Sequence, residues 1–501
     1  MAPPLPIVSP ISATIACVSI VTLYIVGVIF YRLYLHPLRD WPGPLLWRIS
    51  GLPRAYHLMK GDLTFKIAEL QGKYGRFFRV MPNEVACNDP RAWKDIYGHR
   101  VGGQNQEMPK FKGSFIVPSY LPPSIIEADR EQHSLLRRQL SHGFSEKSLR
   151  QQEGIIGAYV QLLIQRLHEH SKNGSVALNM REWFNYVSFD IIGDLGFGSS
   201  FGCLESSSYH PWVQVISNAL LESAAFRALN TLGLRPLVDL MFRLGATKKN
   251  DENMELVRNK VQERMKLGME RPDLIEGLLR KKNEWQMDLE GLAANANVLI
   301  IAGSETTSTL LCGTVSLLTS NPDKLAKLAQ EVRSSFNSDE EITLLSVNNL
   351  SYMLACLNEA FRLYPPAAAD LPRVVPKGGA TVAGRFVPEG TIAAVWQWPM
   401  YHNPEFWTDP YDYVPERWMG DPKYKDDVFD VLQPFSFGPR NCIGRNLAYA
   451  EMRLILAKIV FNFDMDIADD SRRWMKDQKT YVLWDKPSLN VYLTPVAKKG
   501  E

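Results

Sequence analysis

The chain is best interpreted from ten residues near its carboxyl end, Phe435-Ser-Phe-Gly-Pro-Arg-Asn-Cys-Ile-Gly444. They place Cys442 at the start of an apolar helix that the pattern predicts from Ile443 to about Phe461. Unpaired N–H groups and the positive end of the helix dipole stabilise a thiolate there, and a thiolate is a metal ligand. A buried cysteine in a helix-capping turn is a reasonable alternative for Cys-Ile-Gly alone, but the whole string favours a ligand.

Other residues of this loop fit the same interpretation. Gly438 and Gly444 permit close backbone approach to a flat cofactor, and Pro439 fixes the loop. Arg440 supplies a guanidinium that can pair with a carboxylate of that cofactor. The loop is therefore predicted to hold a flat group with a metal at its centre.

Upstream, a helical pattern runs from about Asp288 to Ser320 and ends at Asn321-Pro322. At about 1.5 Å per residue this helix would be roughly 45–50 Å long, so it must cross the core. At its centre stands Ala302-Gly-Ser-Glu-Thr-Thr307, whose carboxylate and hydroxyls are costly to bury unless they are paired. Gly303 weakens the helix, and a threonine that takes over a freed carbonyl opens a groove for dioxygen. A kink with a satisfied Ser/Thr pair is the alternative.

The rest of the body is predicted to be mainly α with small β-sheets, an α+β arrangement. Residues 76–87 alternate around a Pro-Asn turn, which is typical of a strand hairpin, and a Gly- and Pro-rich strand region covers 373–400. Helical periodicity predicts further helices over 130–147, 153–171, 180–196, 212–229, 251–268, 273–283, 323–336 and 352–363.

The amino-terminal segment predicts a membrane anchor. No charged residue precedes Arg32, and the apolar stretch that ends there is long enough to span a bilayer. A cleaved secretory signal is the alternative, but such signals have a basic n-region and a shorter apolar core. Basic residues follow the span and none precedes it, so we expect the body on the cytosolic side. The expected parts are an anchor segment over 1–35 with its span at about 11–31, a proline-rich elbow and start of the body over 36–60, and a catalytic domain over 61–501.

Composition and missing motifs argue against other classes of protein. A net charge of +2 gives no preference for nucleic acid. The six cysteines form no CxxC pair, which argues against a zinc site and a disulfide framework. The chain contains no HExxH helix and no GxGxxG turn, and its one GxSxG match, Gly198-Ser-Ser-Phe-Gly202, follows a predicted helix and not the strand that a nucleophile elbow requires. Neither a hydrolase nor a built-in flavin or nicotinamide domain is therefore indicated.

The ten-residue loop matches FxxGxRxCxG, the cysteine-ligand signature of the cytochrome P450 family, at every fixed position. The chain resembles that family over nearly its whole length, which implies a cytochrome P450 fold preceded by a single transmembrane helix. The resemblance also implies haem b, with Cys442 as the axial thiolate ligand of the iron. The resemblance further implies that Thr306 and Glu305 are catalytic residues that deliver protons during the reaction. The family's structural ion-pair triad is matched by Glu359, Arg362 and Arg417.

The family pattern further suggests which residues contact the haem. Arg137, Arg373 and Arg440 are the implied partners of its propionates. His133 stands where the family commonly has tryptophan, so this chain departs from the pattern there, and His133 is a further candidate for a propionate contact. The remaining implied contacts are Phe435, Gly438 and Gly444.

The resemblance implies a monooxygenase that inserts one oxygen atom from O2 into a lipophilic small molecule by hydroxylation, epoxidation or multi-step oxidation. Electrons would come from NADPH through a separate NADPH-cytochrome P450 reductase, with cytochrome b5 as a candidate second donor, at the endoplasmic reticulum membrane. Two alternatives stay open: a haem-thiolate isomerase or peroxide-using enzyme, and a non-catalytic membrane haem-binding protein.

The substrate is the least determined feature. The family's pocket walls fall at 103–125, 211–245, 298–306 and 367–371, where the residues are mostly small or apolar. His36-Pro-Leu-Arg and the stretch 372–379 resemble fungal members of specialised metabolism, which favours a terpenoid, polyketide or alkaloid substrate.

Overall fold

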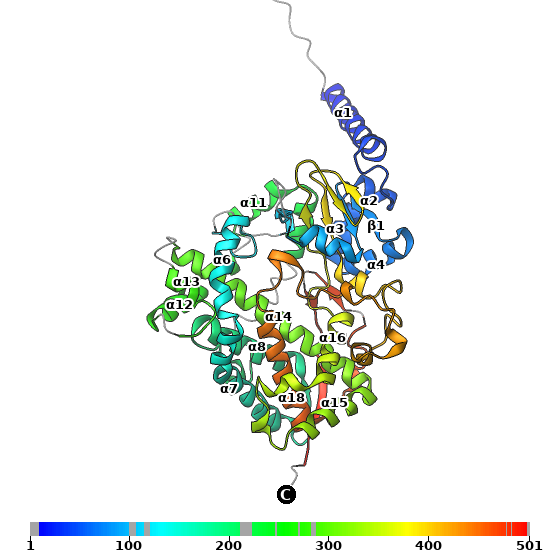
Figure 1. The fold of residues 1–501 in the computed structure, drawn as a ribbon. Coiled ribbons are helices and arrows are strands. Elements are labelled where there is room, and N and C mark those ends of the chain that lie inside the picture. Colours follow the sequence, from blue (N-terminus) through cyan, green and yellow to red (C-terminus); the bar gives the residue numbers. More distant parts are fainter. Residues whose placement is uncertain are drawn as a thin grey trace, which may run out of the picture.

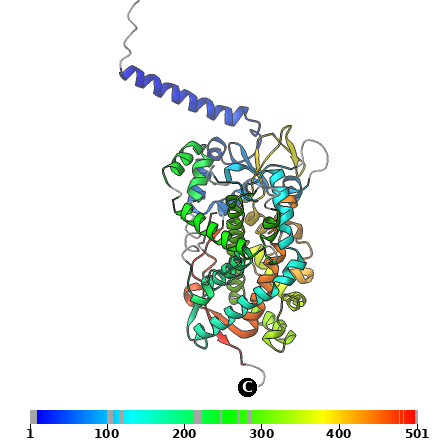
Figure 2. The same ribbon diagram turned by 90° about the vertical axis from the view of Figure 1, so that its left-hand side faces the viewer.

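The computed structural model of the chain describes residues 10–99, 107–114, 121–210, 223–245, 248–268, 271–281, 287–476, 478–481 and 483–497. It confirms a mainly helical body with small β-sheets. Figures 1 and 2 show most of the helices on one side of the body and a smaller part with most of the strands on the other, next to the amino-terminal helix.

The longest helix, α14 (Leu289–Ser320), runs through the middle of the helical part as predicted (Figure 1). The Asp288 carboxylate caps its first turn by accepting from the Gly291 N–H at 2.8 Å. Pro322 begins the next helix and cannot continue this one. Helices α8 (Met180–Phe197), α12 (Lys248–Lys266), α16 (Ser351–Leu363) and α18 (Arg445–Asn462) pack around α14.

The other helices surround this core or join it to the sheets. They are α1 (Pro10–Phe30), α2 (Leu45–Ile49), α3 (Leu52–Lys60), α4 (Leu63–Tyr74), α5 (Pro90–Ala92), α6 (Arg130–Gly143), α7 (Glu146–Ser171), α9 (Cys203–Ser206), α11 (Arg235–Arg243), α13 (Glu276–Lys281), α15 (Pro322–Ser335) and α17 (Gln397–Tyr401), and a further helical stretch covers 223–231.

The largest sheet has the strand order β1 (Phe77–Met81), β2 (Glu84–Cys87), β7 (Ile392–Ala394) and β4 (Arg373–Val374). Strands β1 and β2 form the predicted antiparallel hairpin, and β7 pairs parallel to β2. The sheet thus joins the beginning of the body to a segment far along the chain. The smaller sheets are β3 (Ala177–Asn179) with β11 (Asn490–Pro495) and β8 (Phe463–Ile467), β5 (Ala380–Val382) with β6 (Arg385–Val387), and β9 (Lys479–Thr480) with β10 (Trp484–Asp485).

The amino-terminal helix projects away from the body (Figure 2). The most apolar 18-residue window of Pro10–Leu35 has a mean hydropathy of 2.4 and none of it is buried, so by length and composition the segment is able to cross a membrane. Among the described residues α14 passes the same test, but 72% of its most apolar window is buried, as expected of a core helix. The division of the chain at residues 35 and 60 stays a prediction.

Several predicted helix boundaries are wrong by a few residues. The pattern over 130–147 ends at Gly143, because the Ser145 hydroxyl accepts from the Ser148 N–H at 3.2 Å and starts α7. Helix α7 therefore begins seven residues before the predicted 153. Of the helix predicted over 212–229, only the part from residue 223 lies within the described residues.

Candidate active site

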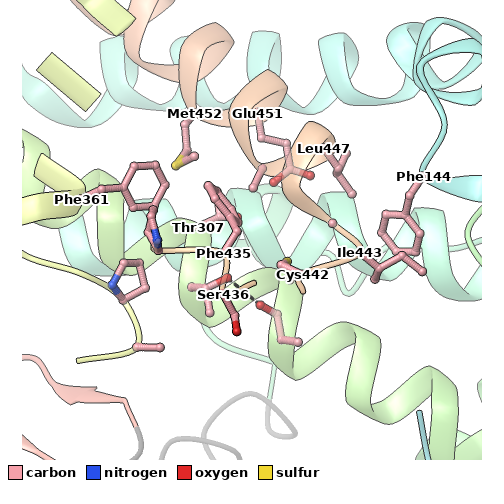
Figure 3. A pocket seen from close by; sticks show the side chains of 18 of the residues that line it. Phe144, Thr307, Phe361, Phe435, Ser436, Cys442, Ile443, Leu447, Glu451 and Met452 are labelled. Carbon is pink, nitrogen blue, oxygen red and sulfur yellow. Dashed lines mark hydrogen bonds between the residues drawn. The ribbon is translucent and has the colours of Figure 1, made fainter. Parts of the chain in front are cut away.

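Cys442 lies between two turns that fix its direction. The loop before it makes a 3-10 turn over Gly438–Arg440, and α18 begins after it at Arg445, two residues later than predicted. The Cys442 N–H donates to the Phe435 carbonyl at 2.8 Å, which closes the loop. The cysteine side chain lines a cavity (Figure 3), so it is accessible from that cavity although protein surrounds it.

The protein around Cys442 does not by itself favour the thiolate. Burial raises the pKa of the Cys442 thiol, while the Gly444 N–H, Arg137 and Arg445 act in the opposite direction. The expected help from the N–H groups at the helix start is present through Gly444, but desolvation outweighs it. A metal ion bonded to the sulfur would reverse this balance, since coordination removes the thiol proton.

Gly438 is required by the backbone. Its φ is +73°, and a Cβ at this position would lie 2.0 Å from the Tyr97 carbonyl oxygen. The close approach that Gly438 permits is thus to Tyr97, and Gly438 does not line the cavity. Gly444 and Phe435 do line it.

The cavity above Cys442 holds about 1060 Å³ of space, part of it open to solvent. Its walls come from α14, α18, the loop after α16 and the cysteine loop itself (Figure 3). The apolar residues that line it are Phe144, Ile192, Leu299, Ala302, Phe361, Pro366, Ala367, Leu371, Pro434, Phe435, Ile443, Leu447, Ala448 and Met452. The predicted pocket walls at 298–306 and 367–371 contribute to it, whereas those at 103–125 and 211–245 lie partly outside the described residues.

The predicted cationic residues gather at one end of the cysteine loop. Arg137 donates to the carbonyl and to the side-chain oxygen of Asn441. Arg440 donates to Glu107 at 2.9 Å and to the Ala128 carbonyl at 2.9 Å. Arg373 is buried and donates to the Leu371 and Pro372 carbonyls. These arginines lie close enough to oppose any further positive charge between them.

The pKa values of His133 and Lys110 are both lowered by burial and by this concentration of positive charge. Burial, followed by Arg440, Lys110, Arg137 and Arg373, lowers the pKa of His133 to about 3. Burial, followed by Arg373 and Arg440, lowers the pKa of Lys110 to about 7. Sequence analysis missed Lys110; its only signal was its place in the loop expected to wall the pocket.

On α14, Thr306 faces the cavity and Glu305 does not. The Thr306 hydroxyl donates to the Ala302 carbonyl at 2.6 Å, and α14 continues through this motif without a break. A Cβ on Gly303 would lie 2.8 Å from Ile192 Cδ1, so this glycine lets α8 pack against α14. The Glu305 carboxylate accepts from Lys486 Nζ at 2.9 Å and is absent from the cavity wall.

Glu451 is a second acid that sequence analysis missed. It is buried on α18, lines the cavity and lies beside Thr307 (Figure 3). Burial raises the pKa of Glu451 to about 8, and a hydrogen bond with Thr307 opposes the rise. The available signal was a carboxylate in the otherwise apolar helix pattern after Cys442.

The predicted ion-pair triad is confirmed as a fully buried cluster. Glu359 accepts from Arg362 at 2.7 Å and from Arg417 at 3.0 Å, and it also accepts from the Trp418 indole at 2.9 Å. Arg362 donates in turn to the Tyr401, Pro410 and Asp412 carbonyls. The cluster ties α16 to the irregular segment that precedes the cysteine loop.

Comparison with known proteins settles the family. The family model "Cytochrome P450" matches residues 41–493, which is most of the chain. The chain belongs to the cytochrome P450 family. It is a cytochrome P450 monooxygenase, and the family implies a haem-thiolate cofactor.

Similar P450s come from fungi. The chain is 48% identical to cytochrome P450 monooxygenase tpeC of Talaromyces stipitatus, over 96% of this chain and 95% of that protein. It is 42% identical to the trichothecene C-15 hydroxylase of Fusarium sporotrichioides, over 94% and 96%. It is 40% identical to the averantin hydroxylase of Dothistroma septosporum, over 96% and 91%.

The residues of this P450 fit a haem. The sulfur of Cys442 faces a cavity with apolar walls, which suits a flat macrocycle with iron at its centre. Two buried polar atoms on the cavity wall, Gln397 Oε1 and Ser436 Oγ, have no hydrogen-bond partner among the described residues. The cations around His133 exceed their acidic neighbours, and two propionate carboxylates would neutralise that excess.

Proposed function

We propose that this P450 inserts one oxygen atom from O2 into a lipophilic small molecule of fungal specialised metabolism. The observation that carries the proposal is a cysteine facing a largely apolar cavity, with the Thr306 hydroxyl on the wall. The reaction uses NADPH, a proton, O2 and substrate, and yields NADP⁺, water and oxygenated substrate. One oxygen atom enters a C–H or C=C bond, and the other leaves as water after receiving two protons.

Haem, when bound, supplies the oxygen chemistry, and thiolate ligation favours cleavage of the O–O bond. Cys442 would be the axial ligand, and Arg137, Arg373, Arg440 and Lys110 would hold the propionates. Thr306 would position water at the oxygen side of the cavity, since its hydroxyl is there and its own hydrogen bond is to the Ala302 carbonyl. The apolar walls would bind the substrate and exclude bulk water.

Thr306→Ala tests this function. We expect NADPH to be consumed still, but most of its electrons to appear as hydrogen peroxide, because the alanine no longer holds a water for proton delivery. Product should fall about tenfold, less than a direct general acid would lose. The measurement is the ratio of product and peroxide to NADPH, with the precursor that accumulates when this gene is deleted as substrate. Fully coupled turnover in Thr306→Ala would remove the threonine from this role.

NADPH-cytochrome P450 reductase is the proposed electron donor, with cytochrome b5 as a second. A hollow of the surface near the start of α18 has three arginines, Arg150, Arg445 and Arg453, against the two acids Glu146 and Glu153, and this basic excess suits an acidic partner. Arg440 is not available for this docking, because its side chain is almost fully buried and bonded to Glu107. Turnover without a reductase would instead favour the isomerase or peroxide-using alternative.

The segment Pro10–Leu35 is the proposed anchor, and the endoplasmic reticulum membrane is the proposed location. Its support is an uncovered apolar helix followed by basic residues. Extraction of cell membranes with alkaline carbonate should leave the full chain in the pellet with reticulum markers, and release into the supernatant would contradict the anchor.

The substrate class is proposed as a polycyclic terpenoid or polyketide. The names of two similar proteins support this substrate class, since one is a trichothecene hydroxylase and the other an averantin hydroxylase. The largely apolar cavity is compatible with either class of substrate.

A further inference from the structure

An acid from a distant segment of the chain occupies Arg440 of the cysteine loop. The Nη2 and Nε groups of Arg440 both donate to Oε1 of Glu107, at 2.9 Å and 3.2 Å. The two side chains are only 6% and 14% exposed. A charge-assisted pair is strong where water is excluded, so Glu107 occupies one edge of the guanidinium group firmly.

The segment that carries Glu107 is fixed by contacts that do not involve Arg440. The next residue, Met108, is 2% exposed and belongs to a hydrophobic core cluster. The Val374 N–H, at the end of β4, donates to the Pro109 carbonyl at 2.8 Å. The backbone therefore places the carboxylate of Glu107 beside the cysteine loop, and the ion pair is a consequence of that placement.

This pair belongs to a larger group of charges around His133. Burial, together with four cations, lowers the pKa of His133 to about 3. The four cations are Arg440, Lys110, Arg137 and Arg373. Two acids, Glu107 and Glu127, act on Lys110 in the direction opposite to its cationic neighbours. With Lys110 protonated, these residues carry an excess of two positive charges, which equals the charge of two propionate carboxylates.

Within this group Glu107 has two effects on a haem whose propionates lie among the cations. Its negative charge reduces the positive potential that the arginines produce at the haem. A less positive surrounding favours the oxidised over the reduced haem, because reduction adds one negative charge. Its carboxylate also competes with a propionate for the N–H groups of Arg440.

We propose that Glu107 is a positioning residue that holds Arg440 and keeps the reduction potential of the bound haem low. The inference rests on the proposed function, because it requires a haem with its propionates among these cations. It deepens that function by naming a residue that controls how readily the haem accepts an electron from the reductase.

Glu107→Gln tests the proposal in the haem-loaded full chain without substrate. The first readout is the reduction potential of the haem iron, followed by absorbance during a redox titration. The substitution removes the negative charge, so the ratio of reduced to oxidised haem at a fixed potential should rise about tenfold, an upward shift of about 59 mV for one electron. Glu107→Asp keeps the charge and should return the potential most of the way to the wild-type value.

The second readout is the rate at which haem leaves the protein, measured by its transfer to an excess of apomyoglobin. In Glu107→Gln the guanidinium group of Arg440 is free to bind a propionate, so the loss of haem should slow severalfold. A purely structural role of Glu107 predicts the opposite result, which is faster loss of haem with an unchanged reduction potential.

Glu290→Gln is the matched control. Glu290, at the start of α14, also accepts two hydrogen bonds from one arginine, Arg258, at 2.6 Å and 3.0 Å. It does not belong to the group of charges around His133, so its substitution should leave both readouts unchanged.

A second variant covers the case in which Glu107→Gln does not fold. Glu107→Ser removes the same charge with a smaller side chain and is then measured in its place. A reduction potential equal to that of Glu290→Gln, in whichever variant folds, overturns the proposal. A wild-type protein without a thiolate-type carbon monoxide spectrum would contradict the proposed function itself, which is a separate result.

Discussion

Cys442→Ala should abolish the thiolate-type spectrum of this P450. Wild-type protein, reduced and exposed to carbon monoxide, is expected to show the strongly red-shifted Soret band of a thiolate ligand, and the variant should show none. No other described cysteine can replace it, because none of them lines the cavity: Cys17 lies on the amino-terminal helix α1, and Cys87, Cys203, Cys312 and Cys356 are buried elsewhere. Oxygenation of the substrate should fall below detection, since the thiolate favours O–O cleavage.

Two controls separate ligation from folding and haem retention. Cys356→Ala removes a buried cysteine of α16 and should keep the red-shifted band. Arg373→Leu removes one of the cations proposed to hold the haem propionates and should lower the haem content, while the haem that remains should keep that band. A red-shifted band in Cys442→Ala, or an imidazole-type spectrum in the wild type, would contradict the assignment of Cys442 as the ligand.

Glu359→Gln should have the largest effect on stability. The substitution leaves the Arg362 and Arg417 guanidinium groups fully buried without their shared carboxylate. Breaking a buried pair in this way typically costs about 3–5 kcal/mol, a large part of the stability of an ordinary domain. We expect a lower urea midpoint of the haem-loaded protein, with loss of haem in the same transition because the cluster holds the segment before the cysteine loop.

Glu169→Gln is the control for this result. Glu169 pairs with Arg166 on the surface of α7, where its side chain is 43% exposed. Solvent screens such an exposed pair, so it contributes little to stability and the urea midpoint should hardly move. Equal midpoints for Glu359→Gln and Glu169→Gln would contradict a structural role of the cluster.

Some residues and elements of the site were predicted correctly from the sequence. The string from Phe435 to Gly444 singled out Cys442, and the apolar pattern of α14 placed Thr306 on a helix that crosses the core, because both signals are local. The hairpin of β1 and β2 was predicted for the same reason. Helix ends were less accurate, since a side-chain cap such as Ser145 competes with a continuing apolar pattern.

The sequence by itself determined the family and singled out Cys442 and Thr306, since these depend on short motifs with fixed spacing. Only the tertiary structure decided the environment of each group. It placed Lys486 on Glu305, across 181 residues of sequence, and Lys110 among the arginines. It also buried Glu451 on the cavity wall and raised the pKa of Cys442. The physical reason is that pairing, desolvation and exposure to a cavity depend on which distant segments meet, and no local pattern records those contacts.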